Sequence, residues 1–433
     1  NSIKDTGYDV ANSLRFNNDD SPQLHKTPGG AGNQDAWTLS MWVKRSSVAQ
    51  SGTQSLYGVY ADGNNQETLA FDSGGNVDKL YWQFYQSGGV VGQLTTTRLF
   101  RDVSAWYNIV VSYDSANGTA GNRMRMWING TEETGFDTDT NPSSGLNSQW
   151  NGTTKHQIGC INTTNYFDGY MAEVVSLDGT AVTDATLFGE FDEDSAIWKP
   201  KDVSGLTGGT NGFYLDFEDS SNLGNDVFGG TDLTEVNLAA TDQSTDTCTN
   251  NFATLNPLYN AYVDPTFSEG NLKITQSSGW SGAKATMGVS TGKWYWEIKL
   301  TGTMSSHQHG VQQENVNESA QDPQNITGST VFYNHDGGEM RTDGTATTAD
   351  YGTFSSGDIM GLALDMDAGS YGQITIYKNG SAIVSDFNLA SSSTTVMPFL
   401  CIDNSTVECN FGSPPYAISS GNADGNGYGN FEY

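Results

Sequence analysis

The chain has 433 residues, of which 50 are acidic and 19 basic, so its formal net charge is −31. This acidity argues against nucleic-acid binding, which needs a basic surface, and against adsorption to anionic lipid. The 51 glycines and 20 tyrosines, with only 16% charged residues, favour short strands joined by many turns. We therefore expect an all-β chain of two or three domains, and no apolar run approaches the roughly 20 residues of a membrane span.

Strands with period-two alternation dominate the first part of the chain. In Trp37–Val43 (WTLSMWV) four large apolar side chains share one face, as a half-buried strand requires. Tyr107–Tyr113 (YNIVVSY) repeats this pattern, and Arg123–Ile128 (RMRMWI) runs into Asn129-Gly130, a strong hairpin signal. Such strands, separated by Gly, Asn and Asp turns, predict a sandwich of antiparallel sheets.

This first region resembles the laminin-G-like or concanavalin-like jelly rolls. The matching pieces are Ser13–Phe16 (SLRF), Trp37–Arg45 (WTLSMWVKR), Trp106–Tyr113 (WYNIVVSY), Met126–Gly130 (MWING) and Phe167–Val175 (FDGYMAEVV). Asn108 stands where the family usually has histidine, and Ala172-Glu173 stands where it has an acidic pair. The resemblance implies a concanavalin-like β-sandwich, which we assign to residues 1–200.

An oxygen-rich loop in this region is a candidate calcium site, and calcium is the one cofactor that the sequence suggests. Laminin-G-like and pentraxin-like sandwiches often hold Ca²⁺ at loop carboxylates, and the ion takes about six to eight oxygen ligands. Asp62, Asn64, Gln66 and Glu67 lie close together in sequence, and Asp168 lies in a later turn. Neither segment matches a strict calcium loop, so an ordinary polar turn is the alternative.

Residues 201–250 are rich in Gly, Asp, Asn and Thr and contain one good strand, Gly212–Phe217 (GFYLDF). We expect a connecting segment that docks on the first domain. Phe213–Glu218, followed by Thr247–Pro257 (TCTNNFATLNP), resembles structural proteins of marine bacteriophages, in which a laminin-G-like and a SPRY-like domain occur in tandem. Cys248 departs from that pattern, because these proteins usually have proline there.

Three motifs in the last part of the chain resemble the SPRY domain, in the expected order. They are Gly292–Leu300 (GKWYWEIKL), Gly357–Gly380 (GDIMGLALDMDAGSYGQITIYKNG) and Met397–Gly412 (MPFLCIDNSTVECNFG). The resemblance implies a second β-sandwich, over residues 251–433, that binds rather than catalyses. Trp294 and Trp296 share one face of the first of these strands, so we expect both rings to be buried between the sheets.

Candidate ligand-binding residues lie in two expected loops of the second domain, the polar insertion Thr303–Thr330 and the segment Tyr333–Tyr351. Loops at a sandwich end are free to vary, and exposed rings can cover the apolar face of a sugar. Packing in the core or rim is the alternative for the tyrosines. A His-x-His pair on a strand could instead bind metal, whereas exposed loop histidines are the simpler interpretation. The candidates are His307, His309, Tyr333, His335 and Tyr351.

The sequence contains no motif typical of an enzyme. Glycosidases of concanavalin-like fold place paired acids on one strand face, but the nearest match, Glu190–Asp194 (EFDED), follows a turn-like segment, so we expect a solvated turn. A serine elbow, a phosphate-binding loop and a Cys/His nucleophile pair are not found. Cys401 and Cys409 flank the turn Asp403–Ser405 and could form a disulfide across a hairpin, but reduced, half-buried thiols are the simpler interpretation.

The resemblance over nearly the whole chain implies a non-enzymatic bacteriophage virion protein on a tail fibre, an appendage or the capsid surface. Such a protein would bind a host-surface glycan or protein through its sandwich loops. Its other expected partners are virion subunits, in a homo-oligomer or array whose multivalency strengthens weak binding. The alternatives are a purely structural decoration protein and, less favoured, a polysaccharide-degrading glycosidase. We expect no nucleic-acid partner and no membrane insertion.

Overall fold

The structure is a computed structural model that describes residues 7–49, 52–259, 261–314, 330–334, 337–389 and 395–433. The chain divides into two compact units, Asn1–Asn251 and Phe252–Tyr433. Both units are built from antiparallel strands, and the helical segments in the described residues are short 3-10 turns at Asn18–Asp20, Gly74–Asn76, Ala120–Asn122 and Ala240–Asp242. The described residues therefore contain no helix long and apolar enough to span a bilayer. The prediction of an all-β chain is confirmed.

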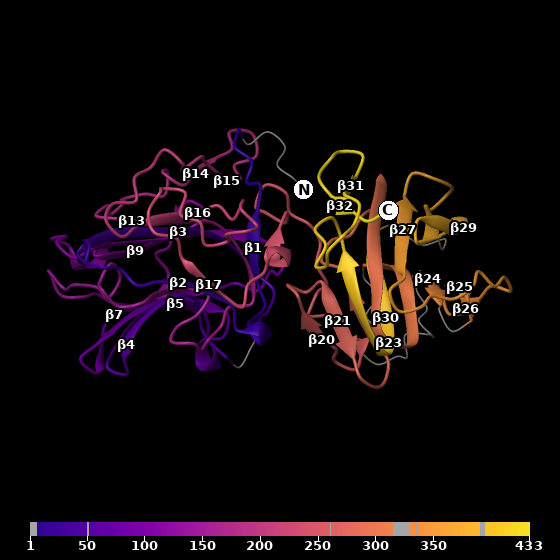
Figure 1. Cartoon of the computed structure of the whole chain (residues 1–433), viewed down its shortest axis with the longest axis horizontal. Helices are drawn as coiled ribbons and strands as arrows, with labels where there is room; N and C mark the ends of the chain where they lie inside the picture. The colour runs from indigo at the N-terminus through magenta and orange to yellow at the C-terminus, as the bar shows by residue number, and fades with distance from the viewer. Residues whose placement is uncertain (1–6, 50–51, 260, 315–329, 335–336, 390–394) are drawn as a thin grey trace. The chain divides into compact units, whose positions relative to one another are not determined.

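Two antiparallel sheets form the layers of the first unit (Figure 1). The first sheet has the order β10–β9–β8–β3–β13–β1–β18, with β16 also beside β13. Its strands are β1 (Ser13–Phe16), β3 (Ala36–Arg45), β8 (Trp106–Asp114), β9 (Met124–Ile128), β10 (Thr131–Glu132), β13 (Gly169–Asp178), β16 (Phe213–Leu215) and β18 (Gln243–Ser244). The second sheet has the order β11–β7–β6–β5–β4–β12–β2–β17. Its strands are β2 (Gln23–Lys26), β4 (Gln54–Asp62), β5 (Asn65–Phe71), β6 (Lys79–Gln86), β7 (Gly89–Leu99), β11 (Phe136–Thr140), β12 (His156–Ile158) and β17 (Thr234–Val236).

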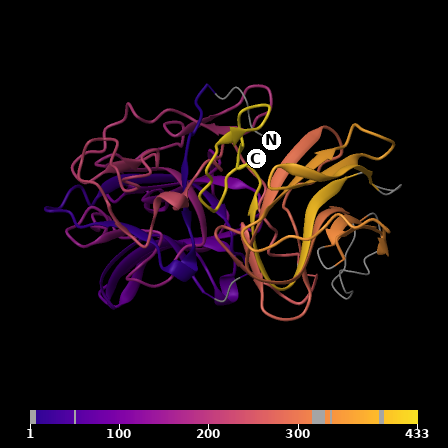
Figure 2. The same cartoon turned by 45° about the vertical axis from the view of Figure 1, so that its right-hand side comes forward.

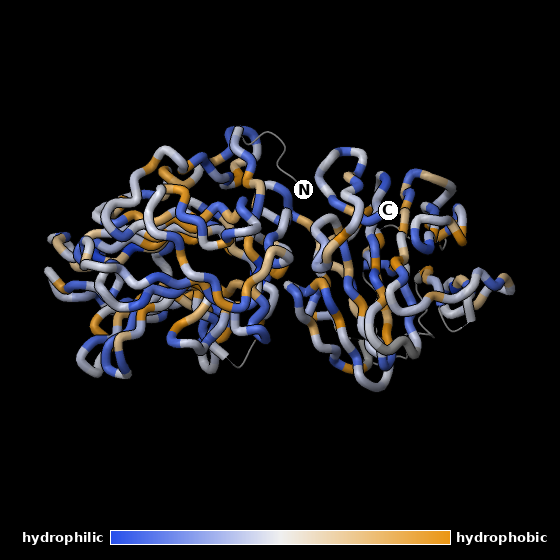
Figure 3. The backbone as a smooth tube through the Cα atoms, in the orientation of Figure 1, coloured by the Kyte–Doolittle hydropathy of each residue, from blue (hydrophilic) through white to orange (hydrophobic). Residues whose placement is uncertain are grey.

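Alternating side chains from both sheets fill the core of the first unit, and the alternation of apolar and polar residues is visible along the strands in Figure 3. The predicted inward residues of β3 and β8 are buried there, including Trp37, Met41 and Val111. The predicted hairpin at Asn129-Gly130 joins β9 to β10 with φ values of 49° and 73°. Glycine is needed at the second position, because an added Cβ would lie 2.1 Å from the ring of Trp198.

The outer face of the first sheet is also covered. Residues 179–206, with the hairpin β14 (Gly189–Phe191) and β15 (Trp198–Pro200), pack on it and form a second apolar cluster around Trp42, Trp127 and Trp198. The first sheet is thus buried on both faces. The outer face of the second sheet is covered only in part: Ala70 and Thr95 are buried, but the outward side chains of β6 remain partly exposed, so a ligand can reach the unit there.

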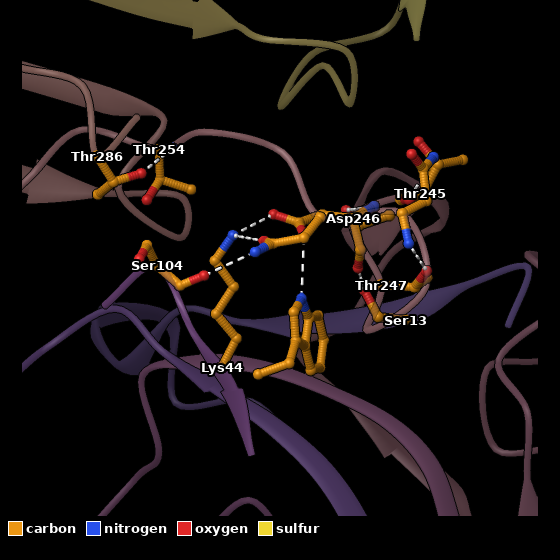
Figure 4. A network of polar contacts seen from close by, with 12 residues as sticks. Ser13, Lys44, Ser104, Thr245, Asp246, Thr247, Thr254 and Thr286 are labelled. Carbon is orange, nitrogen blue, oxygen red and sulfur yellow. Dashed lines mark hydrogen bonds and ion pairs between the residues drawn. The ribbon is translucent and has the colours of Figure 1, made fainter. Parts of the chain in front are cut away.

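The segment 201–250 is an integral part of the first unit. It supplies β16, β17 and β18, which pair with β13, β2 and β1. Figure 4 shows the polar network that fixes its end, centred on the ion pair between Lys44 and Asp246. The docking of strands from this segment agrees with the sequence, but the segment contributes three strands and part of the core, so the unit extends to Asn251.

The second unit is organised by two long strands, β23 (Lys293–Gln313) and β30 (Val396–Asn410), which pair along most of their length. A register shift between Thr301 and Met304 interrupts the pairing, and Figure 2 shows the long strands of this unit curving. The other strands are β19 (Ala261–Tyr262), β20 (Thr266–Ser268), β21 (Lys273–Gln276), β22 (Ser281–Lys284), β24 (Thr330–Asn334), β25 (Glu339–Thr342), β26 (Thr345–Ala346), β27 (Ile359–Asp365), β28 (Gln373–Lys378), β29 (Ser381–Asn388), β31 (Asn422–Ala423) and β32 (Asn430–Phe431).

Two expectations for this unit were wrong in part. Trp296 is buried in the core, but Trp294 is 50% exposed, because it lies at the start of β23, before the pairing with β30 begins at Glu297. Cys401 and Cys409 lie on one continuous strand, β30, rather than on the two arms of a hairpin. The four cysteines, all within the described residues, accordingly form no disulfide.

Candidate functional site

Two of the predicted ligand residues, His307 and His309, lie in the core of the second unit rather than in an exposed loop. β23 continues as a strand to Gln313, and the two rings, which are fully buried, lie on one face of it with Nδ1 of His307 2.9 Å from Nε2 of His309. The expectation of a loop was wrong because a polar stretch was taken for an insertion, whereas its alternate residues face inward.

Of the remaining predicted ligand residues, the two that the structure describes, Tyr333 and Tyr351, do not form an exposed cluster either. Tyr333, on β24, is fully buried and donates a hydrogen bond from its hydroxyl to the carbonyl oxygen of Gly352. Tyr351 is half-buried against the apolar core. His335 lies outside the described residues. Core packing, the alternative weighed for the tyrosines, describes Tyr333.

Three of the candidate calcium ligands, Asp62, Asn64 and Glu67, are not brought together. Asp62 and Asn64 lie in the exposed turn between β4 and β5, where Asp62 accepts a hydrogen bond of 2.7 Å from the backbone N–H of Asn64. Glu67 points into the core, where it accepts hydrogen bonds from the Tyr57 hydroxyl (2.9 Å) and the Gln149 backbone (2.8 Å). Among the described residues, no three His, Cys, Asp or Glu side chains converge in a way suited to a metal ion.

The best candidate site is the outer face of the second sheet, which carries tyrosine and glutamine side chains. On β6, Leu80, Trp82 and Phe84 point into the core and are fully buried. The intervening Tyr81, Gln83 and Tyr85 point outward and are half-buried. We did not predict this site, although the alternation in Lys79–Gln86 (KLYWQFYQ) is a signal that could have revealed it.

Neighbouring strands extend this face in three rows. Tyr60, Gln66 and Tyr85 pair across β4, β5 and β6. Thr68, Gln83 and Gln93 form the next row, and Ala70, Tyr81 and Thr95 form the third. Side chains of directly paired residues stand on the same side of a sheet, about 5 Å apart. The tyrosines therefore flank a central row of amide groups, which we call the tyrosine face.

Hydrogen bonds hold the amides of the tyrosine face in place. Nε2 of Gln83 donates to Oε1 of Gln93 (2.8 Å), and Nε2 of Gln93 donates to Oγ1 of Thr95 (2.9 Å). The Tyr85 hydroxyl donates to the carbonyl oxygen of Gly88 (2.8 Å). Burial, and secondarily the charge of Asp72, raises the pKa of Tyr81, so its hydroxyl stays neutral. The face thus combines fixed aromatic rings with oriented hydrogen-bonding groups, which suits a sugar.

A second chemically distinctive group, Glu173, lies under the cover of the first sheet. Its backbone has φ of 51° at a bulge in β13, and its carboxyl accepts hydrogen bonds from the hydroxyls of Tyr214 (2.8 Å) and Tyr8 (3.1 Å). Burial raises the pKa of this carboxyl to about 7. The adjacent cavity, between Trp42 and Phe188, measures roughly 10 Å³, which is room for one water molecule rather than a substrate.

The acidic cluster Glu190–Asp194 lies in the β14–β15 hairpin. Lys199 lies 3.5 Å from both Glu190 and Asp192, and Lys201 lies 3.3 Å from Glu190. The side chain of Asp192 also accepts hydrogen bonds from Ser195, which lower the pKa of its carboxyl. Glu190 and Asp192 are thus engaged in surface ion pairs, and Asp192 also in turn capping.

Comparison with known families agrees with this architecture. Residues 16–186 match the model of the concanavalin A-like lectin/glucanases superfamily, and residues 293–414 match the model of the SPRY domain. The chain therefore carries a concanavalin A-like domain followed by a SPRY domain, as the sequence motifs predicted. No curated protein matches the chain.

Solved structures resemble each part of the chain at low identity. The SPRY domain of human HERC1 is 20% identical over 36% of this chain and 96% of that chain, with a TM-score of 0.30. A putative carbohydrate binding protein from Bacteroides ovatus is 18% identical, covering 53% of this chain and 58% of that one, with a TM-score of 0.39. The heptameric SAP-like pentraxin from Limulus polyphemus is 14% identical over 41% and 80%, with a TM-score of 0.30. At these levels the similarities carry no functional argument.

Proposed function

We propose that this protein is a non-enzymatic binding protein that holds a neutral glycan of a host surface on its tyrosine face. The observation that carries the proposal is the set of outward rings, Tyr60, Tyr81 and Tyr85, around the hydrogen-bonded amides of Gln83 and Gln93. Aromatic faces cover the apolar side of a sugar ring, and the amides between them can exchange hydrogen bonds with its hydroxyls.

The charges around this face favour a neutral ligand over an acidic one. Lys79, at the start of β6, is paired with Asp137, and Arg98, on β7, is paired with Glu133 at 2.9 Å. The chain as a whole carries a net charge of −31. This negative charge would repel a polyanionic glycan, since complementary potentials steer association and like charges oppose it.

We place this binding function on the surface of a bacteriophage virion. The motifs of Phe213–Glu218 and Thr247–Pro257, together with the tandem of concanavalin A-like and SPRY domains, support that context by resemblance. The expected partners are other virion subunits in a homo-oligomer or array and a glycan or protein of the host cell. A single open sheet face offers modest affinity, and an array multiplies it by raising the effective concentration.

The binding proposal is tested by glycan-array screening of the full chain, followed by calorimetry with the best ligand. Tyr81→Ala and Tyr85→Ala should each weaken binding at least about tenfold, because stacked aromatic residues dominate such contacts. The matched control is Tyr371→Ala, which removes an exposed tyrosine in the second unit. Equal affinity of all three variants overturns the tyrosine face as the site, and the lack of any glycan ligand favours the decoration alternative. Release of sugars from a bound polysaccharide would reveal a glycosidase instead.

A further inference from the structure

A lysine, an aspartate and an asparagine meet where the last residues of the first unit pack on β3 (Figure 4). Nζ of Lys44 lies 2.7 Å from Oδ2 of Asp246 and 2.8 Å from Oδ1 of Asn251. Lys44 is 1% exposed and Asp246 is 3% exposed, so the ion pair is removed from water. Asn251 is half-buried at the edge of this site.

The neighbours of these groups fix their orientation. Nε1 of Trp106 donates to Oδ1 of Asp246 (3.1 Å), which turns the other carboxylate oxygen toward Lys44. Nδ2 of Asn251 donates to the carbonyl oxygen of Ser104 (2.7 Å), so the amide presents its oxygen side to the amine and its nitrogen away from it. The ring of Tyr170 lies 5.9 Å from Nζ of Lys44. The amine of Lys44 is therefore held in contact with both a carboxylate and an amide oxygen, and the amine and the carboxylate are removed from water.

We propose that Lys44 and Asn251 become joined by an intramolecular isopeptide bond, with Asp246 as the catalytic acid and base. Asp246 first takes a proton from the ammonium group of Lys44 across their hydrogen bond, which leaves a neutral amine. The amine lone pair attacks Cγ of Asn251, and Asp246 donates its proton to the developing oxyanion. The Nζ–Cγ bond forms in this attack. Asp246 then takes a second proton from Nζ and passes it to Nδ2, so that collapse of the tetrahedral intermediate breaks the Cγ–Nδ2 bond and releases ammonia. The hydroxyl proton of the intermediate returns to Asp246 as the new amide carbonyl forms. The three protons of the original ammonium thus end on the new amide, on the ammonia and on Asp246, so atoms and charge balance without a further reagent.

The environment favours this reaction in two ways. A contact of 2.8 Å between amine and amide oxygen holds the nucleophile close to the carbonyl carbon, which removes most of the entropic barrier to attack. Burial of two opposite charges is costly, and the product, an amide beside a protonated carboxyl group, carries neither charge. The partial exposure of Asn251 gives the ammonia a route to solvent.

The crosslink would clamp the first unit at the point where the chain leaves it. Lys44 and Asn251 are 207 residues apart, so the bond closes a loop that contains nearly the whole unit. The strand next to the exit, β18, has two residues and little resistance of its own to being pulled away. A covalent bond from the central strand β3 to Asn251 would carry tension past that weak strand. This inference goes beyond the proposed glycan binding and does not depend on it.

The test is the intact mass of the purified, denatured full chain, followed by peptide mapping. The expected result is a mass lower than that of the sequence by one ammonia molecule, together with a branched peptide that contains both Lys44 and Asn251. Succinimide formation at Asn129-Gly130 or Asn379-Gly380 would also release ammonia, but it leaves linear peptides. An unchanged mass, or a mass loss without the branched peptide, overturns the proposal.

Substitutions distinguish a covalent bond between Lys44 and Asn251 from noncovalent packing of the two side chains. Asn251→Ala and Lys44→Arg should abolish the mass loss, whereas Asn250→Ala, which changes the mass by the same amount as Asn251→Ala, should retain it. Asp246→Ala should slow formation of the bond at least about tenfold in protein that still melts cooperatively. A full mass loss in Asn251→Ala, or an unchanged rate in Asp246→Ala, overturns the assignment of the reacting groups.

Discussion

The carboxylate of Glu297 accepts a hydrogen bond of 2.9 Å from the backbone N–H of Tyr433, which lies 136 residues further along the chain. The backbone N–H of Glu432 donates to the same carboxylate at 3.0 Å, and Nδ2 of Asn410 donates at 3.2 Å. Phe431 packs edge-on against Tyr295, with ring centroids 5.0 Å apart. The C-terminal segment, residues 419–433, therefore covers an outward-facing acid of β23 and completes the second unit.

This relationship predicts that Glu297→Ala destabilises the second unit strongly. The substitution removes the acceptor of two partly buried backbone N–H groups and one of the two acceptors of Asn410, and each buried donor left unpaired costs about 1–3 kcal/mol. We expect a loss of more than about 2 kcal/mol in chemical denaturation, and a similar loss on deletion of residues 419–433. Glu408→Ala is the control, because Glu408 is partly exposed and makes a long ion pair of 3.9 Å, so its loss should cost less than about 1 kcal/mol. Equal effects of the two substitutions would contradict this role of Glu297.

The burial of Glu297 shows what the sequence could not predict. The alternation in Gly292–Leu300 places Trp296 inside and Glu297 outside, and both assignments hold for the strand. Glu297 is nevertheless fully buried, because a segment more than a hundred residues away folds over it. Contacts of that range leave no trace in local periodicity, so the motif predicts the strand but not its covering.

The prediction for His307 and His309 was wrong for a different reason, namely the polarity of the surrounding sequence. Their stretch of β23 is rich in polar residues, which is typical of a loop, yet pairing with β30 continues past a register shift and turns both rings inward.

The tyrosine face, by contrast, could have been predicted in part from the sequence. The alternation of Lys79–Gln86 marks one buried and one outward set of side chains, and only the neighbouring strands needed the structure.

The two tryptophans of the same strand should differ sharply on substitution. Trp296 is 3% exposed and packs in the core, so Trp296→Ala should cost about 3–5 kcal/mol. Trp294 is 50% exposed, so Trp294→Ala should cost less than about 1 kcal/mol. Each variant serves as the control for the other in urea denaturation of the full chain. A loss of equal size in both would show that the core extends to the start of β23.

The pH dependence of stability should reveal the buried carboxyl of Glu67. Burial raises its pKa from the usual 4.5 to about 8. A carboxyl group with a raised pKa in the folded state stabilises the protein below its usual pKa, and this contribution is lost as the pH rises through the folded value. The contribution of Glu67 should therefore fall by about 3 kcal/mol between about pH 4 and pH 7.

The measurement is the free energy of unfolding of the first unit across that pH range, in the parent chain and in Glu67→Gln. The amide keeps hydrogen bonds to its neighbours but does not ionise, so the variant should gain stability relative to the parent as the pH rises. Glu193→Gln, at an exposed acid, is the control and should follow the parent. Parallel curves for the parent and Glu67→Gln would show that Glu67 ionises freely in the folded protein.

The division of the chain into two units predicts which fragments of the protein fold on their own. A fragment of residues 1–251 should fold alone, whereas a fragment of residues 1–200 should not, because the latter lacks β16, β17 and β18. It also lacks Phe213, Leu215 and Leu233 of the core, and it leaves Lys44 buried without Asp246. Removing one partner of a buried ion pair alone costs about 3–5 kcal/mol, a large part of the stability of a domain.

Residues 252–433 should fold independently, since they contain a complete core and the C-terminal segment that covers Glu297. Thermal melts of the three fragments decide the matter: a cooperative transition for residues 1–200 at the temperature found for 1–251 would show that the segment 201–250 is a linker and not part of the first unit.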